Sequence, residues 1–354
     1  MKMSLRSLGA SVVAGVLAAA TLSGVASAKP GGHMPGSCFP FHAPVALAEG
    51  QPLSQEISGT YCEPSQWEKG KHKIDVLTAG ATYNASYWDW AQDPSLYSYV
   101  RKTLDSGRAT LAYDRLGSGQ SSHPVSTDIT LSADAWVLHS IVHALRLIGY
   151  KEVDVISHSY GSGIAVREAS LYADVDRVVL TGYLHAGRNP IVAAATYSAN
   201  QDPLFAGAGL DNEYLTSTPA TSTSVSGRQA AFYSTSADQS VINFDDQHKD
   251  LVSTTGFGGY FADKGAPAGA NLSNKIKVPV LLIDGQQDAV FCFSADLGGL
   301  DCNNSADLYR HEVAYYADAE SLTLNLVPDT GHDLTLHPSA GKSFRMIDHW
   351  ISTH

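Results

Sequence analysis

Short apolar segments that alternate with helix-like stretches constrain the fold of this chain more than any other feature. Each segment is an apolar run of the kind that is buried on both faces of a sheet. The predicted strands are residues 73–79, 108–114, 153–157, 176–182, 278–284 and 321–327. Helices are predicted at 132–149, at 160–172 and near "GKSFRMIDHWIS". Strands and helices in this order form a mostly parallel sheet covered by helices on both faces, so we expect an α/β fold.

The helix at 132–149 has the clearest periodic pattern. Ser132 is its expected N-cap and Gly149 its expected end. An apolar stripe at helical spacing consists of Val137, Ile141, Leu145 and Ile148. His139 and His143 lie one turn apart, as metal ligands can, but no Glu follows His139 as in H-E-x-x-H. We therefore interpret both histidines as ordinary helix positions.

Residues 188–273 interrupt the alternation of strands and helices. This segment is rich in Ser, Thr, Ala and Gly, as in "TSTPATSTSVSG", and carries no strong strand signal. A disordered linker is the alternative, but the aromatic residues of "AAFYSTS" and "GFGGYFAD" indicate packing against another part of the protein. We expect an insertion between two core strands, with residues 29–187 and 274–354 forming the core.

The N-terminal segment 1–28 has the order of a secretory signal peptide. Lys2 and Arg6 precede an apolar run and a small-residue site, and cleavage is expected after Ala28. A membrane anchor is the alternative. The apolar run is short and broken by Ser and Gly, whereas a spanning helix needs about 20 mostly apolar residues. We therefore expect a secreted protein without stable membrane insertion.

The charge of the chain bears on its partners. The formal net charge is −12, and removal of the signal would take away two positive charges. An acidic surface of this kind disfavours nucleic acid and anionic membranes as partners. The sequence gives no indication of an oligomeric state.

Four cysteines follow the predicted signal. In an oxidising compartment an even number suggests two disulfides, for which three pairings are possible. Closeness along the chain favours Cys38–Cys62 and Cys292–Cys302. A zinc site is the rival interpretation, but the chain has no C-x-x-C pair.

The stretch "VDVISHSYGSGIAV" (153–166) joins an apolar strand to a small-residue helix through a tight polar turn. Ser157-His158-Ser159-Tyr160-Gly161 has the pattern of a nucleophile elbow, with Ser in place of the usual first Gly. Such an elbow exposes the Ser159 hydroxyl above the sheet and directs the amides of the following helix at the site. We therefore expect Ser159 to be a nucleophile, while Ser157 and His158 fill the turn.

A serine nucleophile needs a base, and the base needs an orienting carboxylate. Asp288 ends "DGQQD" after the strand at 278–284, and His332 lies in "PDTGHD" after the strand at 321–327. The order Ser, acid, His and the positions at strand ends agree with a catalytic triad. The competing acids are Asp284, near its strand end, and Asp329 and Asp333, which are too close to His332 along the chain to orient it easily.

A tetrahedral oxyanion needs two backbone donors. One is expected to be the amide of Tyr160, directly after the nucleophile. The second is expected from "TAGATYNASYWDW", where Gly80 permits a close turn and the Ala81 amide is the predicted donor. Ala79 stands where such loops usually carry the His of an "HG" pair.

Two further segments carry a family resemblance. "DRLGSGQSS" (114–122) matches a D-R-x-G-x-G-x-S loop, and "GATYNASYWD" (80–89) is similar to a segment of secreted fungal and actinobacterial hydrolases. With these motifs, nearly all of the mature chain resembles the α/β-hydrolase superfamily. The resemblance implies an α/β-hydrolase fold, Ser159, Asp288 and His332 as triad, and a cap formed by 188–273. It also implies a small-molecule acyl substrate and neither a metal nor an organic cofactor.

The function that we expect is that of a secreted carboxylic-ester hydrolase. A lactonase or an amide- or peptide-cleaving relative would share the same triad and differ in its pocket and cap. A non-catalytic ligand-binding protein on the same fold is the alternative from another class. Intact triad residues argue against this alternative, and absence of covalent labelling would favour it. The resemblance does not fix the substrate, because the fold hosts many chemistries.

Overall fold

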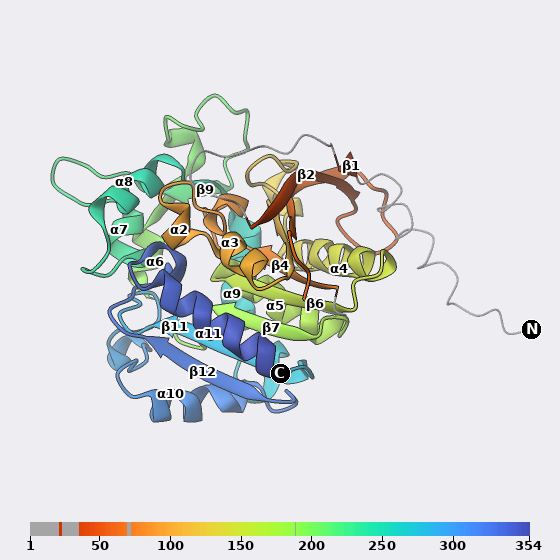
Figure 1. The fold of residues 1–354 in the computed structure, drawn as a ribbon. Helices are drawn as coiled ribbons and strands as arrows, with labels where there is room; N and C mark the ends of the chain where they lie inside the picture. The colour runs from red at the N-terminus through yellow and green to blue at the C-terminus, as the bar shows by residue number, and fades with distance from the viewer. Residues whose placement is uncertain (1–20, 23–34, 69–71, 188) are drawn as a thin grey trace, which may run out of the picture.

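A computed structural model describes residues 21–22, 35–68, 72–187 and 189–354 (Figure 1). The predicted signal peptide, 1–28, lies outside the described residues except for Thr21–Leu22, which form the short strand β1. Within the described part of the chain, no helix is long and apolar enough to cross a membrane.

A nine-stranded sheet lies at the centre of the molecule, with the order β1-β2-β3-β5-β4-β6-β7-β11-β12. The six strands from β5 to β12 in this order pair in parallel, whereas β1, β2 and β3 are antiparallel to their neighbours. All six predicted strands are present: β4 Lys73–Thr78, β5 Ala109–Tyr113, β6 Glu152–His158, β7 Arg177–Thr181, β11 Val280–Gly285 and β12 Leu322–Val327. The predicted mostly parallel sheet is therefore confirmed.

The strands β2 (Gly36–Val45) and β3 (Gln55–Pro64) were not predicted. Strand β2 contains two prolines and is largely half-exposed, so it lacks the continuous apolar run of a central strand. The two strands pair in antiparallel register, with Cys38 opposite Cys62, and a disulfide joins these residues. The second predicted disulfide, Cys292–Cys302, is also present. Both disulfide predictions are confirmed.

Helices cover the sheet (Figure 1). Their bounds are α2 Pro94–Tyr97, α3 Tyr99–Asp105, α4 Leu131–Leu147, α5 Tyr160–Leu171, α6 Pro190–Ala194, α7 Gly227–Phe232, α8 Gln239–Gln247, α9 Thr254–Lys264, α10 Ser305–Glu312 and α11 Ala340–Thr353. Short 3₁₀ turns lie at Ala85–Tyr87, Ser126–Asp128, Ala199–Gln201, Ala268–Ala270, Leu272–Lys275, Ala295–Leu297, Val313–Tyr315 and Leu334–Leu336. Helix α4 packs against α5, and α3 packs against α11, where the rings of Tyr99 and Phe344 meet at 5.4 Å.

Helix α4 corrects two details of the predicted helix at 132–149. Its N-cap is Thr130, whose hydroxyl accepts a hydrogen bond from the amide of Ala133 at 3.0 Å, and not Ser132. The cap lies earlier because Leu131 is buried as the first helical residue. At the other end the helix stops at Leu147, so Ile148 leaves the apolar stripe and is 60% exposed.

The segment predicted as an insertion contains α6 to α9 and a small antiparallel sheet. The strands of this sheet are β8 Thr196–Ser198, β9 Tyr214–Ser217 and β10 Val252–Ser253. They were not predicted because two to four residues are too few to show a periodic pattern. Helices α7 and α8 lie at the left of Figure 1, on the side toward which β12 points. Helix α9 instead packs against α4 and α5.

Candidate active site

Ser159 lies at the turn between β6 and α5, in a conformation that few residues adopt. Its φ is 53° and its ψ is −116°. A non-glycine residue in such a region is strained and persists only where its surroundings hold it. The turn also passes close to β4, because a Cβ on Gly161 would lie 2.5 Å from the carbonyl oxygen of Thr78. This close approach explains the small residue after the turn.

The structure brings Ser159, His332 and Asp288 together in a hydrogen-bonded chain. The distance from Ser159 Oγ to His332 Nε2 is 2.8 Å, and that from His332 Nδ1 to Asp288 Oδ2 is 2.7 Å. Asp288 follows β11 and His332 follows β12, and these two strands are parallel neighbours. Their carboxyl ends therefore meet at one edge of the sheet, beside the turn that carries Ser159.

Local hydrogen bonds hold the carboxylate of Asp288. Its Oδ1 accepts from the amides of Val290 at 2.6 Å and Phe291 at 3.4 Å, and the residue is fully buried. Burial by itself raises the pKa of Asp288, but the adjacent His332 outweighs it, so the pKa is lowered overall. Asp288 is therefore ionised when it accepts the Nδ1 proton of His332.

The pKa of His332 moves in the opposite direction. Burial by itself lowers this pKa, but the negative charge of Asp288 and the hydrogen bond to it outweigh burial, and the pKa is raised. Because Nδ1 carries a proton and donates it in a hydrogen bond to Asp288, Nε2 has a free lone pair, which points at the Ser159 hydroxyl. This arrangement suits His332 to take a proton from Ser159.

Of the competing acids, neither Asp284 nor Asp333 contacts His332 through a hydrogen bond among the described residues. Asp284 is buried at the end of β11, where burial and the neighbouring Asp288 raise its pKa well above its usual range. Asp333 instead faces His158, with 3.1 Å between Oδ1 and Nε2. Asp288 is thus the carboxylate that orients His332.

The amide of Ala81 lies on the loop after β4, beside Ser159, and that of Tyr160 lies at the start of α5, directly after Ser159. Among the described residues, neither amide donates a hydrogen bond to another group. Two free donors beside a serine are the requirement for binding an oxyanion. Arg115 supports the loop of Ala81. Its guanidinium donates to the carbonyl oxygens of Ala79 at 3.1 Å, Gly80 at 2.9 Å and Tyr83 at 3.1 Å.

A narrow pocket opens at Ser159 and His332, and most of its lining is apolar. The remaining lining residues are Ala81, Thr82, Val192, Ala195, Thr196, Phe232, Phe257, Tyr260, Phe261 and Val290. Seven of these ten belong to the segment 189–273. That segment therefore covers the serine and determines most of the shape of the pocket.

A buried polar network that was not predicted connects this segment to the loop of Ala81. Arg228 of α7 pairs with Asp245 of α8 through two contacts of 2.7 and 2.8 Å, and both side chains are fully buried. The same guanidinium donates to the carbonyl oxygen of Thr82 at 3.0 Å. Tyr83 donates to Asp245 at 2.7 Å and contacts Asp333. Because the members are far apart in the sequence, no local pattern could have indicated this network.

His158 joins this network to the turn. Its Nδ1 lies 3.1 Å from the hydroxyl of Thr181, its Nε2 lies 3.1 Å from Asp333, and Tyr87 stacks on its ring at 4.6 Å. Burial and the nearby His332 lower the pKa of His158 well below its usual range, so the imidazole is neutral. His158 therefore does fill the turn, and it also links the turn to Asp333.

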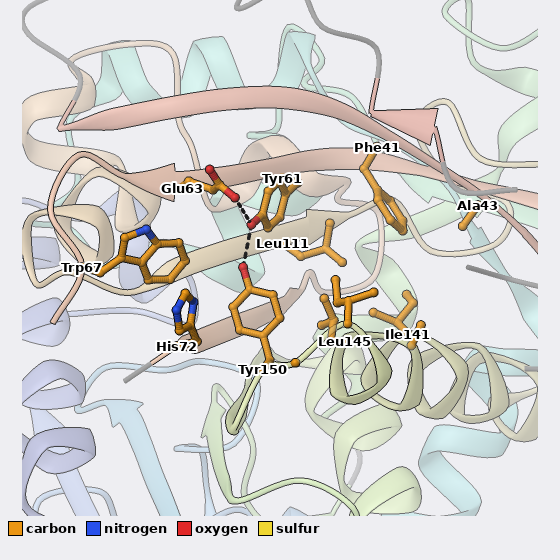
Figure 2. A pocket seen from close by; sticks show the side chains of 13 residues that line it. Phe41, Ala43, Tyr61, Glu63, Trp67, His72, Leu111, Ile141, Leu145 and Tyr150 are labelled. Atoms are coloured by element: carbon orange, nitrogen blue, oxygen red, sulfur yellow. Dashed lines mark hydrogen bonds between the residues drawn. The ribbon is translucent and has the colours of Figure 1, made fainter. Parts of the chain in front are cut away.

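A second cavity lies away from Ser159, between the hairpin of β2 and β3 and the end of α4 (Figure 2). Its lining includes Trp67, His72 and Leu145. At its upper end in Figure 2, Tyr61 donates to Glu63 at 2.6 Å, and its hydroxyl lies 2.6 Å from that of Tyr150. No serine, threonine or cysteine is among the described residues that line this cavity, so it offers no second nucleophile of the serine type.

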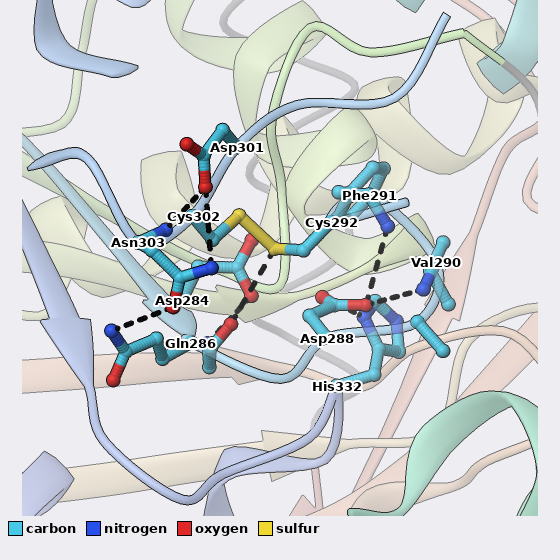
Figure 3. Close-up of a disulfide and its surroundings, with 12 residues drawn as sticks. Asp284, Gln286, Asp288, Val290, Phe291, Cys292, Asp301, Cys302, Asn303 and His332 are labelled. Carbon is cyan, nitrogen blue, oxygen red and sulfur yellow. Dashed lines mark hydrogen bonds and ion pairs between the residues drawn. A yellow bond between two sulfur atoms is a disulfide. The ribbon is translucent and has the colours of Figure 1, made fainter. Parts of the chain in front are cut away.

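The disulfide between Cys292 and Cys302 lies close to the acid of the hydrogen-bonded chain (Figure 3). The amide of Cys292 donates to the carbonyl oxygen of Asp288 at 2.8 Å. The disulfide therefore links the end of the turn around the Asp288 carboxylate to Cys302.

A model of the alpha/beta hydrolase family matches residues 76–341. The chain is similar to a monoacylglycerol lipase from Paleococcus ferrophilus, with 15% identity, 84% of this chain and 99% of that chain covered, and a TM-score of 0.54. It is also similar to an enol-lactonase from Burkholderia xenovorans, with 16% identity, 87% and 100% covered, and a TM-score of 0.52.

A hypothetical protein from Pseudomonas aeruginosa has 14% identity to the chain, with 95% of this chain and 99% of that chain covered and a TM-score of 0.58. No curated protein matches the chain. At such low identities the similarity to solved structures concerns the fold alone, because one fold hosts many functions. Together with the family match, it confirms the predicted α/β-hydrolase fold.

Proposed function

Because the chain belongs to the alpha/beta hydrolase family, we propose that it is a secreted serine hydrolase that cleaves carboxylic esters. The observation that carries this proposal is the hydrogen-bonded chain from Ser159 through His332 to Asp288. The strained turn at Ser159 supports it, because strain of this kind clusters at functional sites. The predicted signal peptide and the two disulfides support secretion.

In the first half of the reaction, the Ser159 oxygen attacks the acyl carbon of the ester. His332 takes the serine proton on Nε2 and passes it to the leaving alcohol, while Asp288 stabilises the imidazolium. The amides of Ala81 and Tyr160 donate to the oxyanion of the tetrahedral intermediate. The products are the free alcohol and an acyl group bound to Ser159.

In the second half, water releases the acyl group. His332 takes a proton from the water, which attacks the acyl carbon, and the same two amides stabilise the second oxyanion. Return of the proton from His332 to Ser159 restores the enzyme. Apart from the substrate and water, each step uses groups of the chain itself.

The apolar pocket favours an acyl group with an apolar chain over a charged one. The aromatic side chains of Phe232, Phe257 and Phe261 form much of its lining. A lactone is an intramolecular ester, so lactonase activity uses the same steps and remains the second candidate. An ester and lactone panel that varies the length of the acyl chain separates the two.

The experiment that tests the proposal is covalent labelling with a fluorophosphonate, followed by peptide mapping. We expect the label on Ser159, and its loss in Ser159→Ala. Ser157→Ala is the matched control, because the Ser157 hydroxyl has no hydrogen-bond partner among the described residues. Folded protein that takes up no label would contradict the proposal and favour a non-catalytic ligand-binding protein.

A further inference from the structure

A cluster of possible metal ligands lies between α4, α5 and the loop after α5. His139 is on α4, Glu168 is on α5, and Asp174 follows α5. The Nδ1 atom of His139 lies 2.8 Å from Asp174 Oδ2 and 4.0 Å from Glu168 Oε1. One ligand atom from each of the three residues falls within 4.8 Å of the other two.

Glu168 is the unusual member of this cluster. It is fully buried, and the groups that its carboxylate faces are a second carboxylate, that of Asp174, and the imidazole of His139 at 4.0 Å. Burial raises the pKa of Glu168 well above its usual range, and Asp174, another carboxylate, raises it further. A buried carboxylate is costly unless a cation or a proton compensates its charge.

The imidazole of His139 is fixed in orientation. Its ring stacks on that of Tyr172 at 4.0 Å and lies 5.3 Å from that of Trp136. These contacts direct Nδ1 toward the two carboxylates. A fixed ligand loses little conformational entropy when it binds an ion.

We propose that His139, Glu168 and Asp174 bind a divalent transition-metal ion, for which zinc is the best fit. One imidazole and two carboxylates are ligands that zinc accepts, and the charge of the ion would balance both carboxylates. Metal–ligand bonds of about 2.0–2.2 Å in a tetrahedron place neighbouring ligand atoms about 3.4 Å apart. The observed separations, from 2.8 Å to at most 4.8 Å, bracket this value. Calcium fits less well, because it takes six to eight oxygen ligands.

The site is separate from the proposed chemistry. Helix α5 begins directly after Ser159, and Glu168 lies nine residues along it, which corresponds to about 13 Å. An ion at this distance does not touch the substrate. It would instead link the C-terminal end of α5 to α4 and so stabilise the folded protein. The N-terminal end of α5 follows the proposed nucleophile.

The experiment measures metal binding to the mature full-length protein. Chelator-treated protein is dialysed and titrated with Zn²⁺ alone by calorimetry. We expect one ion per chain and a rise in melting temperature. Co²⁺ is expected to give visible absorption bands of a tetrahedral site. Initial rates of ester hydrolysis well below the melting temperature are expected to be the same with and without the ion.

Two variants and one matched control assign the ion to these residues. His139→Ala and Glu168→Gln are expected to weaken Zn²⁺ binding at least about tenfold, since changes around metal sites commonly cost 10–100-fold. Glu168→Gln should fold without metal, because an amide needs no charge compensation and can donate to Asp174. His143→Ala is the control: His143 lies one turn further along α4, outside the cluster, and its removal is expected to leave binding unchanged.

Two results would overturn the proposal. Absence of stoichiometric Zn²⁺ binding by the folded protein would mean that Glu168 is protonated and shares its proton with Asp174. Binding that survives both His139→Ala and Glu168→Gln would place the ion outside this cluster. Neither result bears on the labelling of Ser159, so the two proposals fail independently.

Discussion

Replacing both cysteines of the second disulfide, Cys292→Ser with Cys302→Ser, tests how the protein holds the acid of the proposed triad. In the structure, the turn that follows Asp288 wraps its carboxylate and ends at Cys292, whose amide donates to the Asp288 carbonyl oxygen at 2.8 Å. The disulfide ties this end to Cys302 (Figure 3). Without it, the loop between the two cysteines gains freedom next to Asp288.

The loss of stability follows from the length of the closed loop. For a sequence separation of 10 residues, the chain-entropy relation gives a stabilisation of about 2.7 kcal/mol at 25 °C. A chain of 354 residues, less the predicted signal, has an unfolding entropy of about 0.7 kcal/mol per kelvin near its midpoint. We therefore expect the melting temperature of the double variant to fall by about 4 °C.

The rate is expected to fall as well. A displacement of about 1 Å in a catalytic group can cost on the order of a hundredfold in rate. Because Asp288 keeps its own bonds to the amides of Val290 and Phe291, the displacement should be smaller. We expect kcat for a small ester, measured well below the melting temperature, to fall on the order of tenfold, with KM little changed.

The first disulfide is the matched control. Cys38→Ser with Cys62→Ser opens a loop with a separation of 24 residues, for which the same relation gives about 3.4 kcal/mol. This pair joins β2 to β3, away from the hydrogen-bonded chain, so its loss should lower the melting temperature by about 5 °C and leave kcat unchanged. If the Cys292→Ser, Cys302→Ser protein folds with an unchanged kcat, the second disulfide only stabilises and the positional argument is wrong.

Four further predictions follow from the site. Ser159→Ala should lower kcat by about four to six orders of magnitude without lowering the melting temperature, and near-normal turnover of a clean preparation would exclude Ser159 as nucleophile. Because the pKa of His332 is raised above 6.5, kcat/KM for an ester should rise with pH through a midpoint above 6.5. A midpoint below 6.5 would contradict the role of Asp288 as the carboxylate partner of His332. Phe257→Ala should enlarge the pocket and shift the preference among acyl chains toward longer ones, while an unchanged preference would mean that this ring does not contact the acyl group. Arg228→Met should destabilise the protein by about 3–5 kcal/mol, as measured by urea unfolding, because it leaves Asp245 buried without its positively charged partner. A loss under about 1 kcal/mol would mean that the Arg228–Asp245 pair is not stabilising.

The central fold could be predicted because each of its strands is a continuous apolar run. Strand β6, for example, is buried at six of its seven positions, so its residues show the pattern of a doubly covered strand. Strand β2 instead contains prolines and half-exposed residues and lies at the side of the sheet, so it has no continuous apolar run by which the sequence could predict it. Ser132 suits an N-cap as well as Thr130 does, and it is the hydrogen bond from the Ala133 amide to the Thr130 hydroxyl that distinguishes them in the structure.

The hydrogen-bonded chain could be predicted for a different reason. Ser159, Asp288 and His332 each follow a strand, and parallel strands bring their carboxyl ends to one edge, so three local patterns imply one site. The cluster around Glu168 gives no such signal. Along the sequence, the possible ligand that lies one helical turn from His139 is His143, whereas the carboxylates near His139 come from another helix and the loop after it.

The buried network at Arg228 changes how the segment 189–273 is understood. Treated as an insertion, this segment would set the substrate preference while the core carries out the chemistry. Arg228, however, donates to the carbonyl oxygen of Thr82, which directly follows Ala81, the proposed oxyanion donor. The segment and the oxyanion loop are thus one hydrogen-bonded unit, because Tyr83 of the same loop donates to Asp245. Exchange of the whole segment would disturb rate and preference together, and only single changes in the apolar lining, which leave Arg228 in place, can separate the two.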